Sequence, residues 1–337
     1  MEQIRQFVCG ATARLSLVRR VACSLVAAAA CMTTAWPGAQ AADNTRYVSI
    51  TGKNTNPCTL AQPCRSLQKA IGVTPAGGEV RVLDSGFFGN NARIKKSLTI
   101  SGNGHTVYLG NPIFVTDGAA TVALRGLVLN GHESSTTNTI GISIGSNTTG
   151  MAVHIERCVI HGFSFAGIAA TAPGLKVFLV DSVVRDNAGH GFIIVNSGAS
   201  QVTIDGSRIE NNGAAGINIQ SGRAAVSRSI ASGNFRGVNV FGASTSAGVS
   251  STVAFGNADG GFYVESGSMT IESSFAQSNK FGVRADAGAV ARISNSSFIG
   301  NGVGVSASGT VETRENNIVK GSTSLNVFGT LTPIGGT

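Results

Sequence analysis

The sequence predicts an all-β protein: a single right-handed parallel β-helix with three short strands per coil, about ten coils and a short N-terminal capping helix. Three series of residues lead to this prediction. A Gly-apolar-x-apolar segment recurs every 21 to 26 residues, an asparagine stands three or four residues before most of these glycines, and a small polar residue recurs earlier in each unit. The composition agrees, because 45 glycines and only 12% charged residues are typical of a chain with many tight turns.

The glycine series defines the repeat and one strand in each unit. Its eight members are Gly141, Gly167, Gly191, Gly216, Gly237, Gly261, Gly282 and Gly304. Short strands place alternate side chains on opposite faces. Because one unit cannot bury its own apolar face, we expect each strand to stack on its equivalent in the next unit.

Two further series keep the same interval. The asparagines are expected at the sharp turn between the second and third strands, where Asn tolerates left-handed backbone, and are expected to form a ladder of stacked amides. They are Asn187, Asn212, Asn234, Asn257, Asn279 and Asn301. The small polar series, expected to point inward after the first strand, is Cys158, Ser182, Ser207, Ser229, Thr252, Ser274 and Ser296. Cys158 is therefore expected to be a buried core thiol rather than a catalytic or metal-binding residue.

Residues 1–42 predict a secretory signal peptide. Four arginines within the first 20 residues precede the apolar run Val21–Met32, and Ala39-Gln40-Ala41 suits signal peptidase. A retained membrane anchor is the alternative, but the apolar run is shorter than the ~20 residues that span a bilayer. We expect an exported protein, periplasmic, cell-surface or secreted, with no transmembrane span after cleavage.

Residues 43–80 are expected to form the N-terminal cap, and residues 81–337 the β-helix. Cys58 and Cys64 bracket a short loop in a chain expected to be exported, which predicts a disulfide. Two cysteines without further ligands nearby make a poor zinc site. The segment Ser66–Ile71 predicts a short amphipathic helix with a serine N-cap, placed to cover the open first coil.

The strand at Tyr47-Val-Ser, the Cys58–Cys64 loop with its helix and the later Asn…Gly-Ile coils resemble exported bacterial right-handed parallel β-helix repeat proteins of the pectate-lyase-like superfamily. The resemblance covers nearly all of the mature chain and implies the fold. It implies no single activity, because the superfamily includes polysaccharide lyases, hydrolases, epimerases and adhesins.

One motif of polygalacturonase-type members has partial matches. Those members carry Gly-His-Gly and later Arg-Ile-Lys, together with a pair of aspartates. Here Arg93-Ile94-Lys95 precedes Gly189-His190-Gly191, no Asp-Asp occurs, and Gly191 is the ordinary repeat glycine. Because motifs require their structural context, we predict that His190 merely occupies a turn and that the match has no catalytic meaning.

The resemblance also implies a substrate groove along the first strand of each coil. The outward candidates there are His154, Glu156, Arg157, Asp181 and Asp205. With coils ~4.8 Å apart, Glu156 and Asp205, two coils apart, are expected ~10 Å from each other, with Asp181 between them and slightly offset. Such carboxylates would suit Ca²⁺ binding or acid–base catalysis, with Arg157 or His154 as base or uronate clamp. The alternative is that these residues are solvated surface charges. This alternative is favoured, because most exposed charged residues have no further role.

The third strands present a second candidate face. Its outward residues are Asn218, Gln220, Asn239, Phe241, Tyr263, Glu265, Arg284 and Asp286. Aromatic rings flanked by amides, an arginine and carboxylates have the chemistry of sugar binding. Glu265 and Asp286, about one coil apart, would approach the ~5 Å spacing of a retaining glycosidase pair. The alternative is an ordinary surface ion pair braced by Arg284.

Three functions follow from these observations. The first is an exported protein that binds polysaccharide or cell-surface glycan along an exposed strand face; the others are a polysaccharide lyase or hydrolase, and a structural or adhesive solenoid. The first is preferred because no catalytic cluster is recognised and the longest excursion from the repeats is Asn130–Thr139. Loss of the signal lowers the formal charge from +8 to +5 by removing four Arg and one Glu, which suits an acidic polysaccharide. Few aromatics and no basic run argue against nucleic acid. No cofactor is expected, except that Ca²⁺ would suit the first-strand carboxylates.

Overall fold

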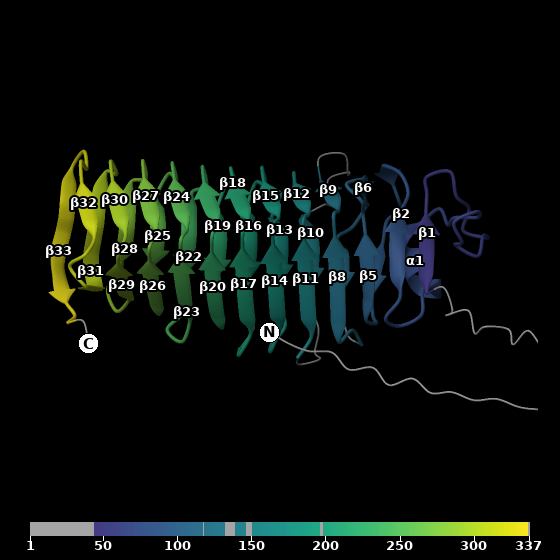
Figure 1. Cartoon of the computed structure of the whole chain (residues 1–337), viewed down its shortest axis with the longest axis horizontal. Helices are drawn as coiled ribbons and strands as arrows, with labels where there is room; N and C mark the ends of the chain where they lie inside the picture. The colour runs from purple at the N-terminus through teal and green to yellow at the C-terminus, as the bar shows by residue number, and fades with distance from the viewer. Residues whose placement is uncertain (1–43, 117, 132–138, 146–149, 196–197, 336–337) are drawn as a thin grey trace, which may run out of the picture. The chain divides into compact units, whose positions relative to one another are not determined.

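The computed structural model of the chain describes residues 44–335, except 117, 132–138, 146–149 and 196–197. The predicted signal peptide, 1–42, and most of the excursion 130–139 lie outside the described residues. The predicted parallel β-helix is confirmed: the chain winds through about eleven turns, and every strand pairs in parallel with its equivalent in the next turn (Figure 1).

Each coil contributes one strand to each of three rows. The first strands are β1 (Thr45–Val48), β2 (Glu79–Val82), β5 (Leu98–Ser101), β8 (Thr121–Arg125), β11 (Ala152–Glu156), β14 (Lys176–Val180), β17 (Gln201–Asp205), β20 (Arg223–Ser227), β23 (Ser246–Ser250), β26 (Ser268–Glu272) and β29 (Val290–Ser294). The second strands are β3 (Gly86–Phe87), β6 (Thr106–Tyr108), β9 (Val128–Asn130), β12 (Val159–His161), β15 (Val183–Arg185), β18 (Arg208–Glu210), β21 (Ile230–Ser232), β24 (Val253–Phe255), β27 (Phe275–Gln277), β30 (Ser297–Ile299) and β32 (Ile318–Lys320).

The third strands carry the repeat glycines. They are β4 (Ala92–Ile94), β7 (Ile113–Val115), β10 (Ile140–Ile144), β13 (Ala166–Ala170), β16 (His190–Ile194), β19 (Ala215–Ile219), β22 (Arg236–Val240), β25 (Gly260–Val264), β28 (Phe281–Ala285), β31 (Val303–Thr313) and β33 (Leu325–Pro333). β31 continues without a break from a third-strand position into the first-strand position of the next coil.

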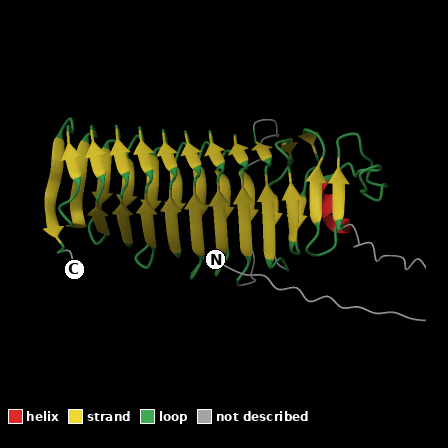
Figure 2. Ribbon diagram, in the orientation of Figure 1, coloured by secondary structure: helices red, strands yellow, loops and turns green. Residues whose placement is uncertain are grey.

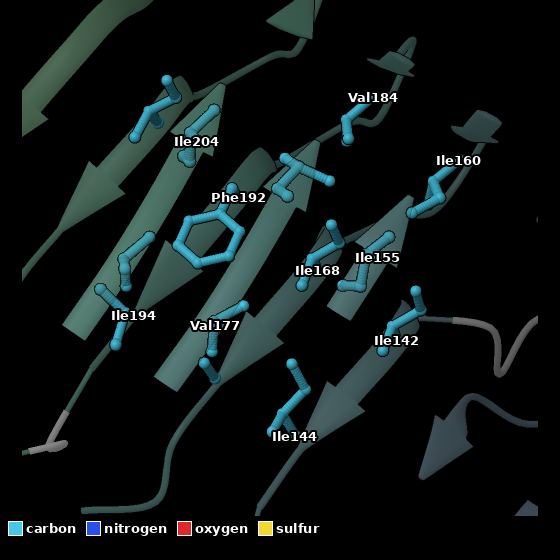
Figure 3. Packing of buried hydrophobic residues seen from close by; sticks show 14 of the residues in the cluster. Ile142, Ile144, Ile155, Ile160, Ile168, Val177, Val184, Phe192, Ile194 and Ile204 are labelled. Atoms are coloured by element: carbon cyan, nitrogen blue, oxygen red, sulfur yellow. The ribbon is translucent and has the colours of Figure 1, made fainter. Parts of the chain in front are cut away.

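The core consists of aliphatic rows that run from coil to coil. Ile142, Ile168 and Phe192 are register partners on successive third strands, and all three are fully buried. Figure 3 shows these side chains together with Ile155 and Val177 of neighbouring first strands, all facing the same interior. A side chain of this size contributes about 1.5–3 kcal/mol when it is buried. Stacking therefore supplies the stability that a single coil lacks.

The asparagines form a hydrogen-bonded ladder on the inside of the corner between the second and third strands. The main-chain N–H and Nδ2 of Asn234 both donate to Oδ1 of Asn257, at 3.0 and 3.2 Å, and Nδ2 also donates to the Ile209 carbonyl. The same pattern repeats from Asn187 to Asn301.

The expectation that these asparagines adopt the left-handed conformation is wrong. The left-handed residue is the one immediately before each of them, for example Asn211 (φ 53°), Gly233 (φ 64°) and Ser278 (φ 57°). The preceding residue makes the turn, so the asparagine itself remains free to direct its amide inward to the next coil.

The small polar series forms a second ladder at the bend after the first strand. Main-chain N–H groups donate to the hydroxyl one coil further on, as Ser182 does to Ser207 at 3.2 Å. Cys158 begins this ladder, and it is buried as expected. Burial raises the pKa of the Cys158 thiol to about 11, so the thiol stays protonated and unreactive at neutral pH.

The N-terminal end of the β-helix is capped by the short α-helix α1 (Leu67–Val73), which Figure 2 shows beside the N-terminal strands. The Ser66 side chain accepts a hydrogen bond from the Lys69 N–H at 3.3 Å, and Leu67, Ala70 and Ile71 are buried against the core. The predicted disulfide between Cys58 and Cys64 is present. Within the part of the chain that the structure describes, no helix is long and apolar enough to cross a membrane.

Candidate functional site

The register places Glu156 and Asp205 at equivalent positions two coils apart, as expected, but Asp181 does not project from the strand face between them. The register pairs Glu156 with Val180 and Val180 with Asp205, so a valine lies between the two acids. Asp181 instead occupies the left-handed bend after β14 (φ 48°), and Arg157 occupies the same bend one coil earlier (φ 52°). The bend interrupts the alternation of side chains, and this displaces both residues from the strand face.

Each of the two remaining candidate acids, Glu156 and Asp205, has a basic partner. The Glu156 carboxylate lies 2.9 Å from the Arg125 guanidinium, and Asp205 binds Arg228 and accepts a hydrogen bond from Ser227 at 2.6 Å. Half-exposed pairs of this kind contribute ~0–1 kcal/mol.

His154, the histidine on this face, also has a side-chain partner. The His154 ring stacks on the Phe178 ring with centroids 4.6 Å apart. Over the described ranges, no group of three or more His, Cys, Asp or Glu side chains is placed to hold a metal ion. On this face Glu156 and Asp205 are thus each held in an ion pair with an arginine.

The third-strand face does bring its predicted residues together. Asn218, Asn239, Tyr263 and Arg284 are successive register partners on β19, β22, β25 and β28. They form one outward row whose members are nonetheless largely buried: Asn218, Asn239 and Tyr263 are only 2–4% exposed. Their polar groups therefore depend on partners in the fold or in a ligand.

One end of this row is an ion-pair network around Tyr263. The Tyr263 hydroxyl donates to the Asp286 carboxylate, which also binds Arg284 Nε at 2.8 Å. The guanidinium groups of Arg236 and Arg284, from the coils before and after, lie 4.1 and 4.8 Å from the Tyr263 ring centroid. Burial, followed by the hydrogen bond to Asp286, raises the pKa of Tyr263, so this hydroxyl remains a donor.

Glu265 is held in a similar way at the middle of the row. It accepts hydrogen bonds from Arg236 and, at 2.9 Å, from Nδ2 of Asn239. Arg236 also binds Asp259 at 3.2 Å. Glu265 and Asp286 thus each bind a separate arginine, as in the ion-pair alternative to a glycosidase pair.

A concavity opens beside these amides, across β16, β19 and β22. Its volume is about 360 Å³. The residues that line it are His190, Ala214, Ala215, Asn218, Gln220, Phe235, Arg236, Asn239, Phe241 and Glu265. Phe235 and Phe241 stand at the two ends of β22 and are 47% and 48% exposed, so two solvent-accessible rings border a polar floor.

Two buried polar atoms in this lining lack a hydrogen-bond partner. They are Oδ1 of Asn239 and Nδ1 of His190; the only other such atom among the described residues is the Ser322 hydroxyl. The Asn239 amide is oriented by its donors, since Nδ2 binds Asn218 and Glu265. Burial lowers the pKa of His190, and a main-chain hydrogen bond at Ala215 opposes this change. The lining of the concavity therefore includes an unused acceptor on β22 and, two coils away on β16, an unused atom of an imidazole whose protonation is disfavoured.

Three of these lining residues were missed by sequence reasoning: His190, Phe235 and Arg236. His190 begins β16 rather than occupying a mere turn, and it and Arg236 hold the same position, directly before the repeat glycine. The repeat in the sequence could therefore have identified this position. The exposure of Phe235 was not, because it depends on how the preceding turn folds over the strand.

Comparisons with known proteins agree on the fold. The family model described as "Right handed beta helix region" matches residues 85–253 and 177–324. A search of curated proteins gave no match. Among solved structures, the A-module of mannuronan C-5 epimerase AlgE4 from Azotobacter vinelandii is 16% identical, with a TM-score of 0.58 over 77% of this chain and 91% of that one.

Two further solved structures have similar scores. The pectate lyase Pel9A is 14% identical with a TM-score of 0.53, over 85% of this chain and 78% of that one. A rhamnogalacturonan lyase is 12% identical with a TM-score of 0.50, over 83% and 84% of the two chains. At these identities the likeness concerns the fold.

Proposed function

This chain belongs to the right-handed β-helix family, and we propose that it is an exported protein that binds a polysaccharide or cell-surface glycan in the concavity of its third-strand face. The observation that carries the proposal is the unpartnered Oδ1 of Asn239. A buried acceptor without a partner costs about 1–3 kcal/mol, and a sugar hydroxyl placed there would recover this cost.

The other lining residues supply what a sugar requires. Phe235 and Phe241 offer ring faces for stacking, while Asn218, Gln220 and Glu265 offer donors and acceptors at fixed positions. The volume of about 360 Å³ falls within the range of small-ligand sites. Solved structures with this fold are named for action on pectate, mannuronan and rhamnogalacturonan, which is consistent with a polysaccharide ligand.

The test is glycan-array binding by the mature chain, followed by calorimetric titration of the glycan that binds. The double variant Phe235→Ala/Phe241→Ala should weaken that binding roughly 10-fold, since each stacked ring contributes about 0.5–1.5 kcal/mol. The control is Phe87→Ala/Phe255→Ala, which removes rings of equal exposure (46% and 47%) from second strands. Absence of array binding, or equal losses in both variants, would contradict the proposal.

A polysaccharide lyase or hydrolase is the second candidate, favoured by the Glu265 carboxylate at the edge of the concavity. Incubation with polygalacturonate and alginate, with and without Ca²⁺, would then give ultraviolet-absorbing unsaturated products or new reducing ends. Loss of that product in Glu265→Gln would assign the reaction to this site. A binding protein gives neither product.

A further inference from the structure

A second hollow lies at the N-terminal end of the coils, between α1 and β4. Its volume is about 480 Å³. It is lined by Gln68, Ile71, Gly72, Asn91, Arg93, Lys95 and Lys96. Three of these seven residues are cations and none is an acid. No part of this hollow belongs to the concavity around Asn239.

The cations are held in place by the fold. Arg93 and Lys95 point outward while Ala92 and Ile94 are buried, so the two cations stand on the same side of the chain with their Cα atoms ~7 Å apart. The Arg93 main-chain N–H donates to Gln68 Oε1 at 2.7 Å, which fixes β4 against the capping helix.

Two of the three side chains, those of Arg93 and Lys96, are positioned as well. The Arg93 guanidinium lies over the Phe114 ring, 4.8 Å from its centroid, and a planar cation stacked in this way keeps its N–H edge available. Lys96 Nζ donates to the Gly72 carbonyl at 3.0 Å, at the C-terminal end of α1.

The cations of this hollow form a local group of positive charge. Eight other arginines of the described surface pair with carboxylates, as Arg125 does with Glu156 and Arg292 with Glu312. None of the ten ion pairs among the described residues involves a cation of the hollow. Positive charge is therefore concentrated here without an internal counter-charge.

We propose that this hollow binds carboxylate groups of an acidic polysaccharide, a polyuronate. Two cations on alternate residues, with Cα atoms ~7 Å apart, match anionic groups that repeat along a chain better than one small anion. A guanidinium edge also fits a planar carboxylate with two parallel hydrogen bonds. The inference rests on the proposed glycan-binding function and adds the charge of the ligand.

The hollow and the concavity lie on the same row of third strands. Register partners lead from Arg93 through Phe114, Ser143, Ala169 and Ile193 to Asn218, five coils and about 24 Å along the axis. One extended polymer can therefore occupy both sites.

The test measures binding of the mature chain to polygalacturonate, dextran sulfate and neutral dextran at an ionic strength of about 0.05 M, where exposed charges are weakly screened. Arg93→Gln/Lys95→Gln should weaken polygalacturonate binding roughly 10-fold or more, because two charge-assisted contacts are lost. The matched control, Lys176→Gln/Arg223→Gln, removes two exposed first-strand cations and should change affinity less than about 2-fold.

Several outcomes would overturn the inference. Equal losses in both double variants would show that net charge alone attracts the polymer. Tighter binding of dextran sulfate than of polygalacturonate would remove the assignment to carboxylates, and absence of binding to any polyanion would remove the site. The Phe235→Ala/Phe241→Ala variant reports separately on the proposed function, because those rings lie outside the hollow.

Discussion

Two rows of buried asparagines run through this β-helix, one inside the corner of the coils and one on the outer face of the third strands. Inside, the amide oxygen of Asn257 accepts two hydrogen bonds from Asn234, and its Nδ2 donates to Asn279 and to the Ala231 carbonyl. Outside, Asn239 is equally buried, and its Nδ2 is used, but its Oδ1 has no partner.

The difference separates a structural amide from one that suits a ligand. The inner row is saturated by the chain itself, so nothing outside the protein can add to it. The outer row leaves an acceptor buried at the floor of an open concavity, bordered by exposed rings. Asn257 and Asn239 are the same residue type and are equally buried, but every polar atom of the Asn257 amide has a partner whereas the Asn239 oxygen has none.

The largest expected effect is on the inner row. Asn257→Ala should lower the free energy of unfolding by about 2–4 kcal/mol, because the Asn234 N–H and Nδ2 lose their acceptor inside the core. Urea unfolding followed by circular dichroism measures this loss.

The matched variant is Asn239→Ala on the outer row. It should lower the free energy of unfolding by about 1 kcal/mol or less, because the lost bonds to Asn218 and Glu265 are partly offset by removal of the unpartnered oxygen. The same variant should weaken glycan binding, whereas Asn257→Ala should not. If both variants destabilise the fold equally, the proposed division between the rows is wrong.

The repeat made the inner row predictable and the outer row only partly so. The interval of Asn187, Asn212 and the later asparagines placed the ladder, since side chains at equivalent positions of stacked coils must meet. The conformation of the turn was not predictable from composition. Asn211 and Asn212 are both good turn formers, and only the inward direction of the second decides which of them is left-handed.

The outward-facing residues were also only partly predictable from the sequence. Alternation along the third strands correctly placed Asn218, Asn239 and Tyr263 in one row. On the first strands it failed at Asp181, because a one-residue bend ends the alternation there. Residues within strands were thus predictable from periodicity, whereas those at bends, such as Asp181, required the structure.

A smaller effect is expected from His190, which borders the outer row. Its pKa in the folded protein is lowered by burial, while the unfolded chain has a histidine pKa of about 6.5. Below pH 6.5 the unfolded state therefore binds more protons, and the free energy of unfolding should fall as the pH decreases from 6.5 through the folded-state pKa, by at most about 1.4 kcal/mol per pH unit.

The measurement compares urea midpoints of wild type and His190→Gln between about pH 5 and 8. The variant should lose the part of the pH dependence that lies below 6.5. His154→Gln, on the first-strand face, serves as the control. An unchanged pH profile in His190→Gln would mean that the buried imidazole is not constrained to its neutral form.

The smallest effect is expected from Glu265, which separates the two interpretations of the outer row most sharply. Glu265→Gln keeps the side-chain volume, and Arg236 retains Asp259 as a partner, so the free energy of unfolding should fall by about 1 kcal/mol or less. Asp205→Asn, whose partner Arg228 is 70% exposed, should cost about as little. A loss of several kcal/mol in Glu265→Gln alone would make Glu265 a brace of the same kind as the inner asparagines. The concavity would then be a by-product of structural packing, and Asn239 would need another explanation for its unpartnered oxygen.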